Sequence, residues 1–195
     1  MRADSEALKE ASTKQRIVEA LTELVQDTSF DKIRVGDICE KAYISKATLY
    51  RHFENKYEIV RWLFTKSCAA GVDLIGIDYN WFEGNIVTTR MLQPHADLLS
   101  SIMQKEDMAA FATTRQRYET LVSTICEVKH QEVTTELEYQ ITAYVHTEVA
   151  LVEHWFRMRE NVSVRQLCDY IVSAVAEPLF DLLNEPEHPG NFGTK

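Results

Sequence analysis

The sequence predicts an all-α protein in which a helix-turn-helix domain, residues 1–60, is joined by a long helix to a larger helical domain, residues 61–195. Only 6 Gly and 4 Pro occur in 195 residues, which disfavours an architecture of many tight turns and fits long helices. Charge is also divided unevenly. Residues 1–66 contain 12 Lys and Arg against 11 Asp and Glu, whereas residues 67–195 contain 9 against 19. Such an asymmetry suggests two functions in one chain.

The composition argues against a membrane, secreted or disulfide-rich protein. No apolar stretch approaches the roughly 20 residues that a membrane-spanning helix requires. The opening segment, MRADSEALKE, lacks the apolar core of a signal peptide, so we expect a cytoplasmic protein. The four cysteines lie far apart, without a Cys-x-x-Cys pair, which argues against a zinc ribbon and a disulfide framework.

The first helix is predicted from a capping box and a helical apolar pattern. Ser12 and Gln15 form the capping box, so we expect the helix to begin there and to end at about Asp27. Its apolar residues recur at helical spacing: Ile17, Leu21, Leu24 and Val25.

Three further helices follow before residue 75. A short second helix is marked by its apolar residues, Val35, Ile38, Cys39 and Ala42. Ser45 can cap a third helix that runs to about Phe53. Asn55, with Glu58 three residues later, can cap a longer fourth helix.

The second domain shows longer helical patterns. Residues 75–85 contain two Gly and are expected to form a loop. Residues 86–103 are predicted to form a helical pair interrupted at Pro94, because Pro cannot continue a helix. Residues 107–128 and 133–159 are predicted to form long amphipathic helices.

The segment YISKATLYRHFENK, residues 43–56, concentrates Lys, Arg, His and Tyr on one short helix. Leu49 and Phe53 are four residues apart, so they share the face that packs against the first helix. Ala47 and Arg51 lie opposite, where small Ala47 would let the helix approach a surface closely. A short helix that follows another helix and a tight turn is a helix-turn-helix, whose second helix enters the DNA major groove. A solvated polar face is the alternative, but the order and spacing of the four helices favour DNA binding.

Residues 14–64 resemble the DNA-binding region of the TetR family of bacterial transcription regulators. The resemblance covers the first third of the chain and implies an all-helical homodimer with a recognition helix at 46–52. It also implies a C-terminal domain for dimerisation and small-ligand sensing. From it we expect a repressor that leaves a pseudo-palindromic double-stranded DNA operator when a small molecule binds. The residues that carry it are Arg16, Ile17, Phe30, Val35, Asp37, Ile38, Ala42, Ile44, Ser45, Thr48, Leu49, Tyr50, His52, Phe53 and Lys56.

The resemblance also implies roles for individual residues. Thr48, Tyr50 and Lys56 match positions that contact the DNA backbone, and Lys46, Ala47 and His52 match positions that reach bases or nearby phosphates. The full predicted set is Arg34, Gly36, Lys46, Ala47, Thr48, Tyr50, Arg51, His52 and Lys56.

Three residues depart from the family pattern. Arg34 stands where the family usually has a Thr that caps the second helix, and it could reach a phosphate instead. Gly36 stands where a polar or basic residue is frequent, and it offers only a backbone amide. Tyr43 stands in the turn, where Gly is common.

The second domain is predicted to provide a ligand pocket and a dimer interface. Aromatic side chains between helices are a common style of ligand site, although burial in the core is the alternative for each one. The pocket candidates are Trp62, Phe111, Tyr118, Tyr139 and Tyr144. Two apolar stripes match the place where the family builds a four-helix interface, although each could instead be buried within its own domain. The first stripe comprises Val145, Val152 and Trp155. The second lies on a helix that we expect to begin at a capping box of Ser163 and Gln166 and to kink near Pro178. It comprises Leu167, Ile171, Val175 and Leu179.

Two other functions were weighed. A helical-bundle metalloenzyme needs two Glu-x-x-His pairs, and Glu127 and His130 form a single match. A coactivator with this fold that binds a protein rather than DNA would be expected to have a degraded recognition helix, whereas Lys46, Tyr50 and Lys56 are present. We therefore expect no enzymatic activity, no cofactor and no metal.

Overall fold

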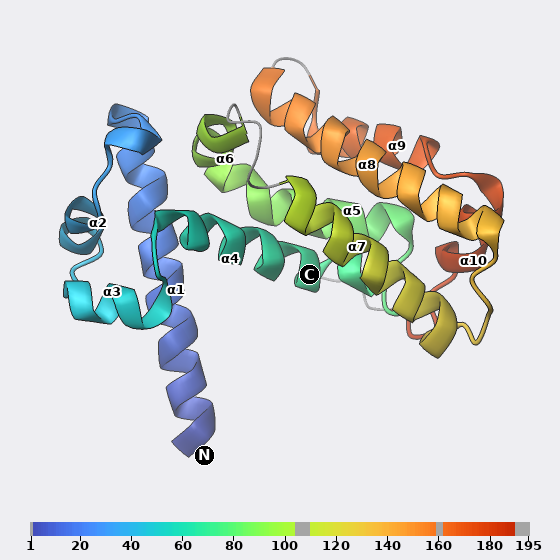
Figure 1. The fold of residues 1–195 in the computed structure, drawn as a ribbon, viewed down its shortest axis with the longest axis horizontal. Helices are drawn as coiled ribbons and strands as arrows, with labels where there is room; N and C mark the ends of the chain where they lie inside the picture. Colours follow the sequence, from blue (N-terminus) through green and yellow to red (C-terminus); the bar gives the residue numbers. More distant parts are fainter. Residues whose placement is uncertain (1, 104–109, 159–161, 190–195) are drawn as a thin grey trace. The chain divides into compact units, whose positions relative to one another are not determined.

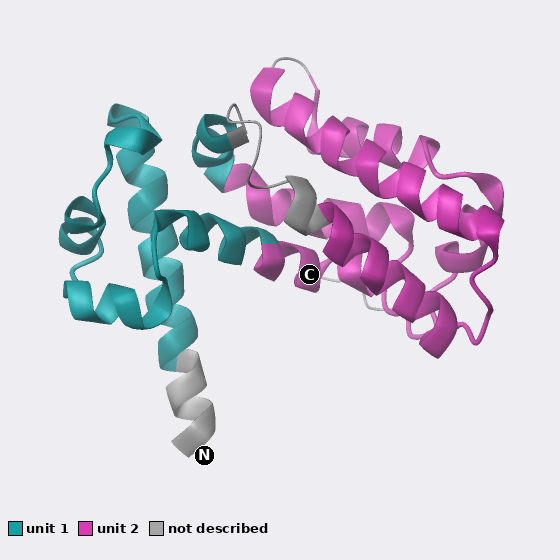
Figure 2. Cartoon of the chain, in the orientation of Figure 1, with its two compact units in different colours: residues 1–64, 95–105 teal, residues 65–94, 106–195 magenta. Residues whose placement is uncertain are grey.

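The computed structural model describes residues 2–103, 110–158 and 162–189, whose regular structure is helical (Figure 1). The one departure within them is an isolated bridge between Ile75 and Tyr79. The all-α prediction is therefore confirmed. The chain forms two compact units: unit 1 comprises residues 1–64 and 95–105, and unit 2 comprises residues 65–94 and 106–195 (Figure 2). The domain predicted for residues 1–60 falls within unit 1, which also takes in residues 95–105 from later in the chain.

Unit 1 is built around its first helix, against which α2 and α6 pack. That helix begins at Arg2, so the predicted start at Ser12 is wrong. The residues before Ser12 are mostly strong helix formers without Gly or Pro, and they extend the helix past the capping residues. The elements of unit 1 are α1 (Arg2–Asp27), η1 (Phe30–Lys32), α2 (Val35–Lys41), α3 (Lys46–His52), the first part of α4 (Lys56–Ala70), and α6 (Ala96–Met103).

The predicted caps of the short helices are present. Ser45 Oγ accepts a hydrogen bond from the Thr48 amide at 3.0 Å, which begins α3. Asn55 Oδ1 accepts hydrogen bonds from the amides of Tyr57 and Glu58, at 2.9 and 3.1 Å, which begins α4. These caps explain why two helices start within ten residues of each other.

Helix α6 belongs to unit 1 because polar and apolar contacts attach it to α1. Thr22 Oγ1 and His95 Nδ1 lie 2.7 Å apart, and Gln26 Nε2 donates to Asp97 Oδ2 at 2.7 Å. Leu98 and Leu99 are fully buried. The break that separates α6 from α5 is the 3-10 turn η3 (Gln93–His95), which contains the predicted Pro94.

Unit 2 contains the remaining helices. Two predictions fail here. Helix α5 begins at Trp81, inside the predicted loop, because Asn80 and Glu83 form a reciprocal capping box. The last predicted helix is two helices: α9 ends at Ser173, and α10 starts at Glu177. Pro178 lies in the first turn of α10, where an amide hydrogen would have no partner within the helix. The elements are the end of α4, η2 (Val72–Leu74), α5 (Trp81–Leu92), α7 (Ala110–Ser123), the π-helical turn η4 (Thr124–Val128), α8 (Thr135–Met158), α9 (Val164–Ser173) and α10 (Glu177–Asn184).

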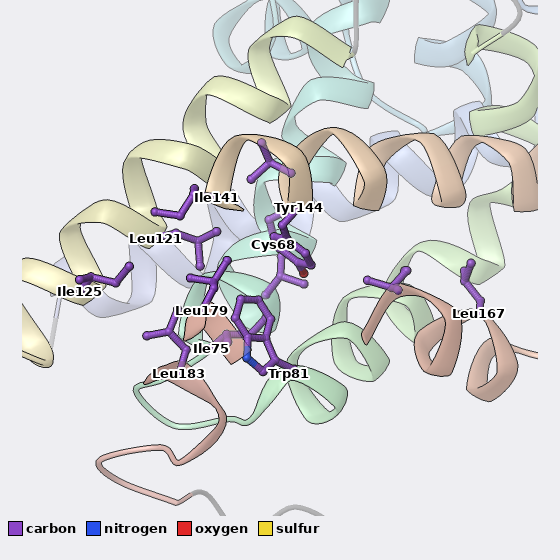
Figure 3. Close-up of a cluster of buried hydrophobic side chains, with 13 residues drawn as sticks. Cys68, Ile75, Trp81, Leu121, Ile125, Ile141, Tyr144, Leu167, Leu179 and Leu183 are labelled. Atoms are coloured by element: carbon purple, nitrogen blue, oxygen red, sulfur yellow. The ribbon is translucent and has the colours of Figure 1, made fainter. Parts of the chain in front are cut away.

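The core of unit 2 surrounds the fully buried indole of Trp81 (Figure 3). The rings of Trp81 and Tyr144 pack edge to face with centroids 4.8 Å apart. Trp81 Nε1 donates to the Phe180 carbonyl at 3.0 Å, so the polar edge of the indole is satisfied. Leu179 and Leu183 of α10 complete this core, and both are fully buried.

Gly71, directly after α4, allows the chain to approach α5 closely beside Gly84. A Cβ on Gly71 would lie 2.4 Å from Thr88 Oγ1 and 2.5 Å from the Gly84 carbonyl oxygen. The Thr88 hydroxyl accepts from the Val72 amide at 2.9 Å and donates to the Ser67 carbonyl at 3.2 Å. A side chain at residue 71 would therefore disrupt two buried hydrogen bonds.

We predict that Gly71→Ala lowers the free energy of unfolding by about 1–3 kcal/mol, because the added methyl overpacks this contact. Urea denaturation measures the change. Gly36→Ala is the matched control: its Cβ would meet nothing nearer than Lys46 Cε at 3.8 Å. Because Ala is favoured over Gly in a helix, that control should be neutral or slightly stabilising. A Gly71→Ala protein as stable as the wild type would contradict the close approach.

Candidate nucleic-acid interface

The turn between α2 and α3 is a Schellman motif. The Ile44 amide donates to the Cys39 carbonyl at 2.9 Å, and the Tyr43 amide donates to the Glu40 carbonyl at 3.2 Å. These two bonds satisfy the last carbonyls of α2 and require a left-handed residue between them. Tyr43 provides it, with φ of 53°. The chain then reverses directly into the Ser45 cap of α3.

The orientation of α3 is set by its buried side. Leu49 is fully buried and Phe53, which follows the helix, is 5% exposed. The Phe53 ring packs edge to face on Trp62, with centroids 6.1 Å apart. The Thr48 hydroxyl lies 2.9 Å from Ser45 Oγ, so this predicted DNA contact also takes part in the helix cap. The opposite side of α3 therefore faces solvent.

The outward side carries most of the predicted contact residues. Lys46, Ala47 and Arg51 are exposed, and Tyr50 is 54% exposed. These four residues lie on one short helix whose remaining side is anchored in unit 1.

The start of α2 lies beside the start of α3. Gly36 is half-buried, and its missing side chain leaves room for the Lys46 stem. The Arg34 amide donates to Asp37 Oδ2 at 2.7 Å, so the carboxylate of Asp37 stabilises the start of α2. The exposed Arg34 side chain is therefore not needed as a cap, which agrees with the sequence-based interpretation.

His52 is placed differently from the prediction. Its side chain is 6% exposed, and Nδ1 lies 3.8 Å from Glu10 Oε1 of α1. Burial, together with the neighbouring Arg51 charge, lowers the pKa of His52 below its ordinary value. Because the His52 side chain is directed toward α1, this structure does not place it for the predicted contact with bases or nearby phosphates, which stays a prediction.

Lys56 is also directed into the protein. Its Nζ donates to the carbonyls of Phe30, Asp31 and Ile33 at 2.6, 3.1 and 2.9 Å, and lies 4.6 Å from the centroid of the Phe30 ring. A lysine has three N–H donors, and here all three have acceptors within the chain. The predicted phosphate contact of Lys56 is incompatible with this arrangement.

The predicted pocket residues do not form one site. Trp62 belongs to unit 1, Tyr139 is 75% exposed, and Tyr118 is partly buried against the core of unit 2. Tyr144 is buried beside Trp81. The side chain of Phe111 lies outside the described residues.

Unit 2 instead contains a buried polar cluster around Arg117, which sequence reasoning missed. Arg117 Nη1 donates to Asp73 Oδ1 and to the Val72 carbonyl, each at 3.0 Å, and Nε donates to Glu148 Oε2 at 3.3 Å. The side chain is 2% exposed, and Nη2 is a buried donor with no acceptor among the described residues. The available signal was a basic residue four positions before buried Leu121, on the inner face of α7.

Other titratable groups near Arg117 are held neutral. Burial raises the pKa of the Cys68 thiol to about 12. Burial and the Glu148 carboxylate raise the pKa of Tyr144 above its ordinary value, and Asn85 Nδ2 donates to its hydroxyl at 3.4 Å. The cluster therefore combines an ion-paired arginine with neutral hydrogen-bonding groups within an apolar core.

The predicted interface stripes lie largely in the core of unit 2. Val145, Leu167, Ile171 and Leu179 are at most 2% exposed, which corresponds to the alternative of burial within the domain. Val152, Trp155 and Val175 are partly buried against the same core. A dimer interface on α8 and α9 would have to use their exposed side chains, which include Tyr139, Met158 and Tyr170.

Glu127 and His130 do not have the geometry of a Glu-x-x-His metal pair. Glu127 lies in the π-helical turn η4, and His130 follows that turn with φ of 52°. Within residues 2–103, 110–158 and 162–189, no group of three or more His, Cys, Asp or Glu side chains could hold a metal ion. No helix in the described part of the chain is long and apolar enough to cross a membrane.

Comparison with known proteins agrees with the helix-turn-helix geometry. Residues 17–62 match the sequence profile described as the N-terminal domain of bacterial regulatory proteins of the tetR family. The helix-turn-helix part of the chain is therefore similar to the DNA-binding domain of TetR-family transcription regulators. The matched family comprises transcription regulators rather than enzymes, which agrees with the expectation of no enzymatic activity.

A curated relative from Lactococcus lactis subsp. lactis, strain IL1403, is 29% identical over 80 residues. It is named the HTH-type dhaKLM operon transcriptional activator DhaS. The match spans 41% of this chain and 43% of that relative, so the chain covers less than half of its length.

Two solved structures share the fold. The dihydroxyacetone kinase operon activator DhaS superposes with a TM-score of 0.65 and 21% identity, covering 88% of this chain and 96% of that one. A TetR-family transcriptional regulator from Streptomyces coelicolor superposes with a TM-score of 0.56 and 16% identity, covering 94% and 93%.

We predict that Lys56→Met lowers the free energy of unfolding by about 1–3 kcal/mol, because it leaves partly buried carbonyls near Phe30 without a donor. Urea denaturation measures this change. Lys46→Met, which removes an exposed ammonium, is the control and should leave stability within about 0.5 kcal/mol. If Lys56→Met were as stable as the control, the three internal hydrogen bonds would not exist in solution.

Proposed function

We propose that this protein is a cytoplasmic, dimeric regulator that binds a pseudo-palindromic double-stranded DNA operator through α3. The single observation that carries the proposal is the division of α3 into two sides. Leu49 is buried, while Lys46, Tyr50 and Arg51 are exposed together. Basic and phenolic side chains on an exposed recognition helix are groups that contact phosphates and base edges.

The exposed residues have separate roles in this proposal. Arg34 and Arg51 neutralise phosphates, and the Tyr50 hydroxyl donates to the backbone. Small Ala47 allows α3 to enter the groove closely, and Lys46 reaches a base edge or a nearby phosphate. His52 acts indirectly, by packing α3 against α1 beside Glu10. This set favours DNA over a protein as the partner of α3.

The short length of α3 supports the proposal that the protein is a dimer. Helix α3 has only 7 residues, so one copy reads few base pairs, and a two-fold dimer is needed to present two half-sites. We propose that α8 and α9 form the interface through exposed side chains such as Tyr139 and Tyr170. Both are large and more than half exposed, at 75% and 52%. A homodimer of this kind would make the operator a pseudo-palindrome.

We predict that selection from random duplexes enriches a pseudo-palindrome, and that the complex contains two chains per duplex by sedimentation. Arg51→Ala should weaken binding to all sequences and reduce the slope of log affinity against log salt by about 1 for each phosphate that is no longer neutralised. Lys46→Ala should also reduce discrimination among sites.

Arg115→Ala is the matched control, because Arg115 is an exposed arginine in unit 2 that pairs with Glu119. It should leave DNA affinity unchanged. Failure to enrich any sequence at low salt would contradict the proposal, and so would an Arg51→Ala protein that binds as well as the wild type.

We further propose that a small molecule bound in unit 2 lowers operator affinity. Arg117 supports this, because Nη2 is a buried donor without an acceptor among the described residues. An unsatisfied buried donor is costly, and a ligand with a carbonyl, hydroxyl or carboxylate oxygen would satisfy it. Asp73 and Glu148 already neutralise the guanidinium, which favours an uncharged acceptor over a second anion.

We predict that a panel of small uncharged metabolites contains a compound that raises the melting temperature and lowers operator affinity. Because coupling is reciprocal, the operator should weaken that compound by the same factor. Arg117→Lys keeps the charge but removes the Nη2 donor, so it should reduce ligand affinity while retaining operator binding. A compound that binds without changing operator affinity would contradict the proposed control.

The direction of regulation has two candidates. Repression requires only that the dimer occupy an operator, and we propose it as the function. Activation is the alternative, favoured because the curated relative DhaS and the solved structure of the same name are both called activators. A reporter gene placed behind the selected operator distinguishes them, because the protein lowers expression in the first case and raises it in the second.

A further inference from the structure

Tyr43 combines two features that rarely occur together. Its φ of 53° lies in the left-handed region, and its side chain is 91% exposed. Within the described residues, His130 is the other residue besides Gly with a positive φ. Histidine adopts this region several times more often than most side chains, whereas a bulky aromatic residue there is an outlier.

The strain at Tyr43 is not offset within the chain. The Schellman motif needs a left-handed residue, and Gly would supply it without a Cβ clash. The Tyr43 ring is almost fully exposed, so burial of the ring does not offset the strain. Among the described residues of unit 1, nothing therefore requires a tyrosine here, and strain of this kind is typical of functional sites.

The position of Tyr43 indicates what the side chain contacts. It lies two residues before the Ser45 cap, in the turn that leads directly into α3. When a recognition helix lies in the major groove, the residues that flank it run beside the sugar–phosphate backbone. The nearby basic side chain of Lys41 is already paired with Glu23 at 2.6 Å. The Tyr43 hydroxyl is thus a hydrogen-bond donor that the turn can present to a DNA phosphate.

We propose that the Tyr43 hydroxyl donates a hydrogen bond to a DNA phosphate next to the recognition helix, and that the strained backbone of the turn is retained for this contact. The proposal rests on the proposed DNA-binding function. It adds a positioning residue that contributes affinity without reading sequence, because phosphate contacts carry no direct base information.

Three substitutions separate the backbone from the phenol. Tyr43→Gly and Tyr43→Asn relieve the left-handed strain and remove the ring, so both should raise the melting temperature, by about 2–4 °C. Both should weaken binding to the selected operator duplex about tenfold or more, since each subunit then lacks a hydrogen bond to a charged group. Tyr43→Phe keeps the ring and the strain, so it should melt like the wild type and show the same reduction in affinity.

The reduction should be uniform. Binding to a mixed-sequence duplex should weaken by the same factor as binding to the operator, and the salt dependence should not change, because a phenol releases no counterion. The combination of higher stability with lower affinity is the signature of strain kept for binding.

The outcomes are distinguishable from failure of the DNA-binding function itself. If the wild type binds no duplex in the same assay, the function fails. If the wild type binds and Tyr43→Phe binds equally well, the phosphate hydrogen bond is overturned. If all three variants bind like the wild type, or if Tyr43→Gly is less stable than the wild type, the assignment of Tyr43 to DNA is overturned.

Discussion

The burial of Leu49 and Phe53 is the constraint on which the interface depends. Helix α3 has 7 residues, fewer than an isolated helix needs to be stable in water, so its existence and direction come from its anchors. The buried Leu49 side chain fixes the rotation of the helix, and Phe53 fixes its end against Trp62. Because that side is fixed, the opposite side of α3 faces outward. It carries Lys46, Ala47, Tyr50 and Arg51.

The features that the sequence predicted correctly are those encoded by near neighbours. The Ser45 and Asn55 caps depend on amides two or three residues away, so the residue type and the spacing suffice. The directions of His52 and Lys56 depend on partners far along the chain. Lys56 donates to main-chain carbonyls more than twenty residues earlier, and a carbonyl has no sequence signature. The sequence therefore shows that a contact position carries a basic residue, but not whether the side chain points toward solvent or into the protein.

The same limit explains unit 2. Helical spacing of Leu167 and Ile171 indicated a buried side, but periodicity does not say whether the covering surface belongs to the same chain or to another. The chain covers it itself, with the α5 helix packed against α9. Pro178 was expected to kink a long helix, whereas it starts a new one, because the same fixed φ that interrupts a helix is suitable for its first turn.

For the proposed DNA-binding function, the distribution of charge favours a dimer for an energetic reason as well as a geometric one. The chain has a formal net charge of −9, and several basic side chains of unit 1 are occupied internally: Lys41 pairs with Glu23, for example, and Lys56 donates to carbonyls. Arg34, Lys46 and Arg51 remain exposed near α3, so one subunit offers few phosphate contacts. In the proposed dimer, two linked DNA-binding domains double that number, and binding of the second domain becomes intramolecular once the first has bound. Affinity for an operator then depends on whether both domains can bind at once. In the proposed regulation, a ligand in unit 2 need not alter any DNA-contacting side chain, since a change that prevents simultaneous binding of both half-sites is enough to release the protein.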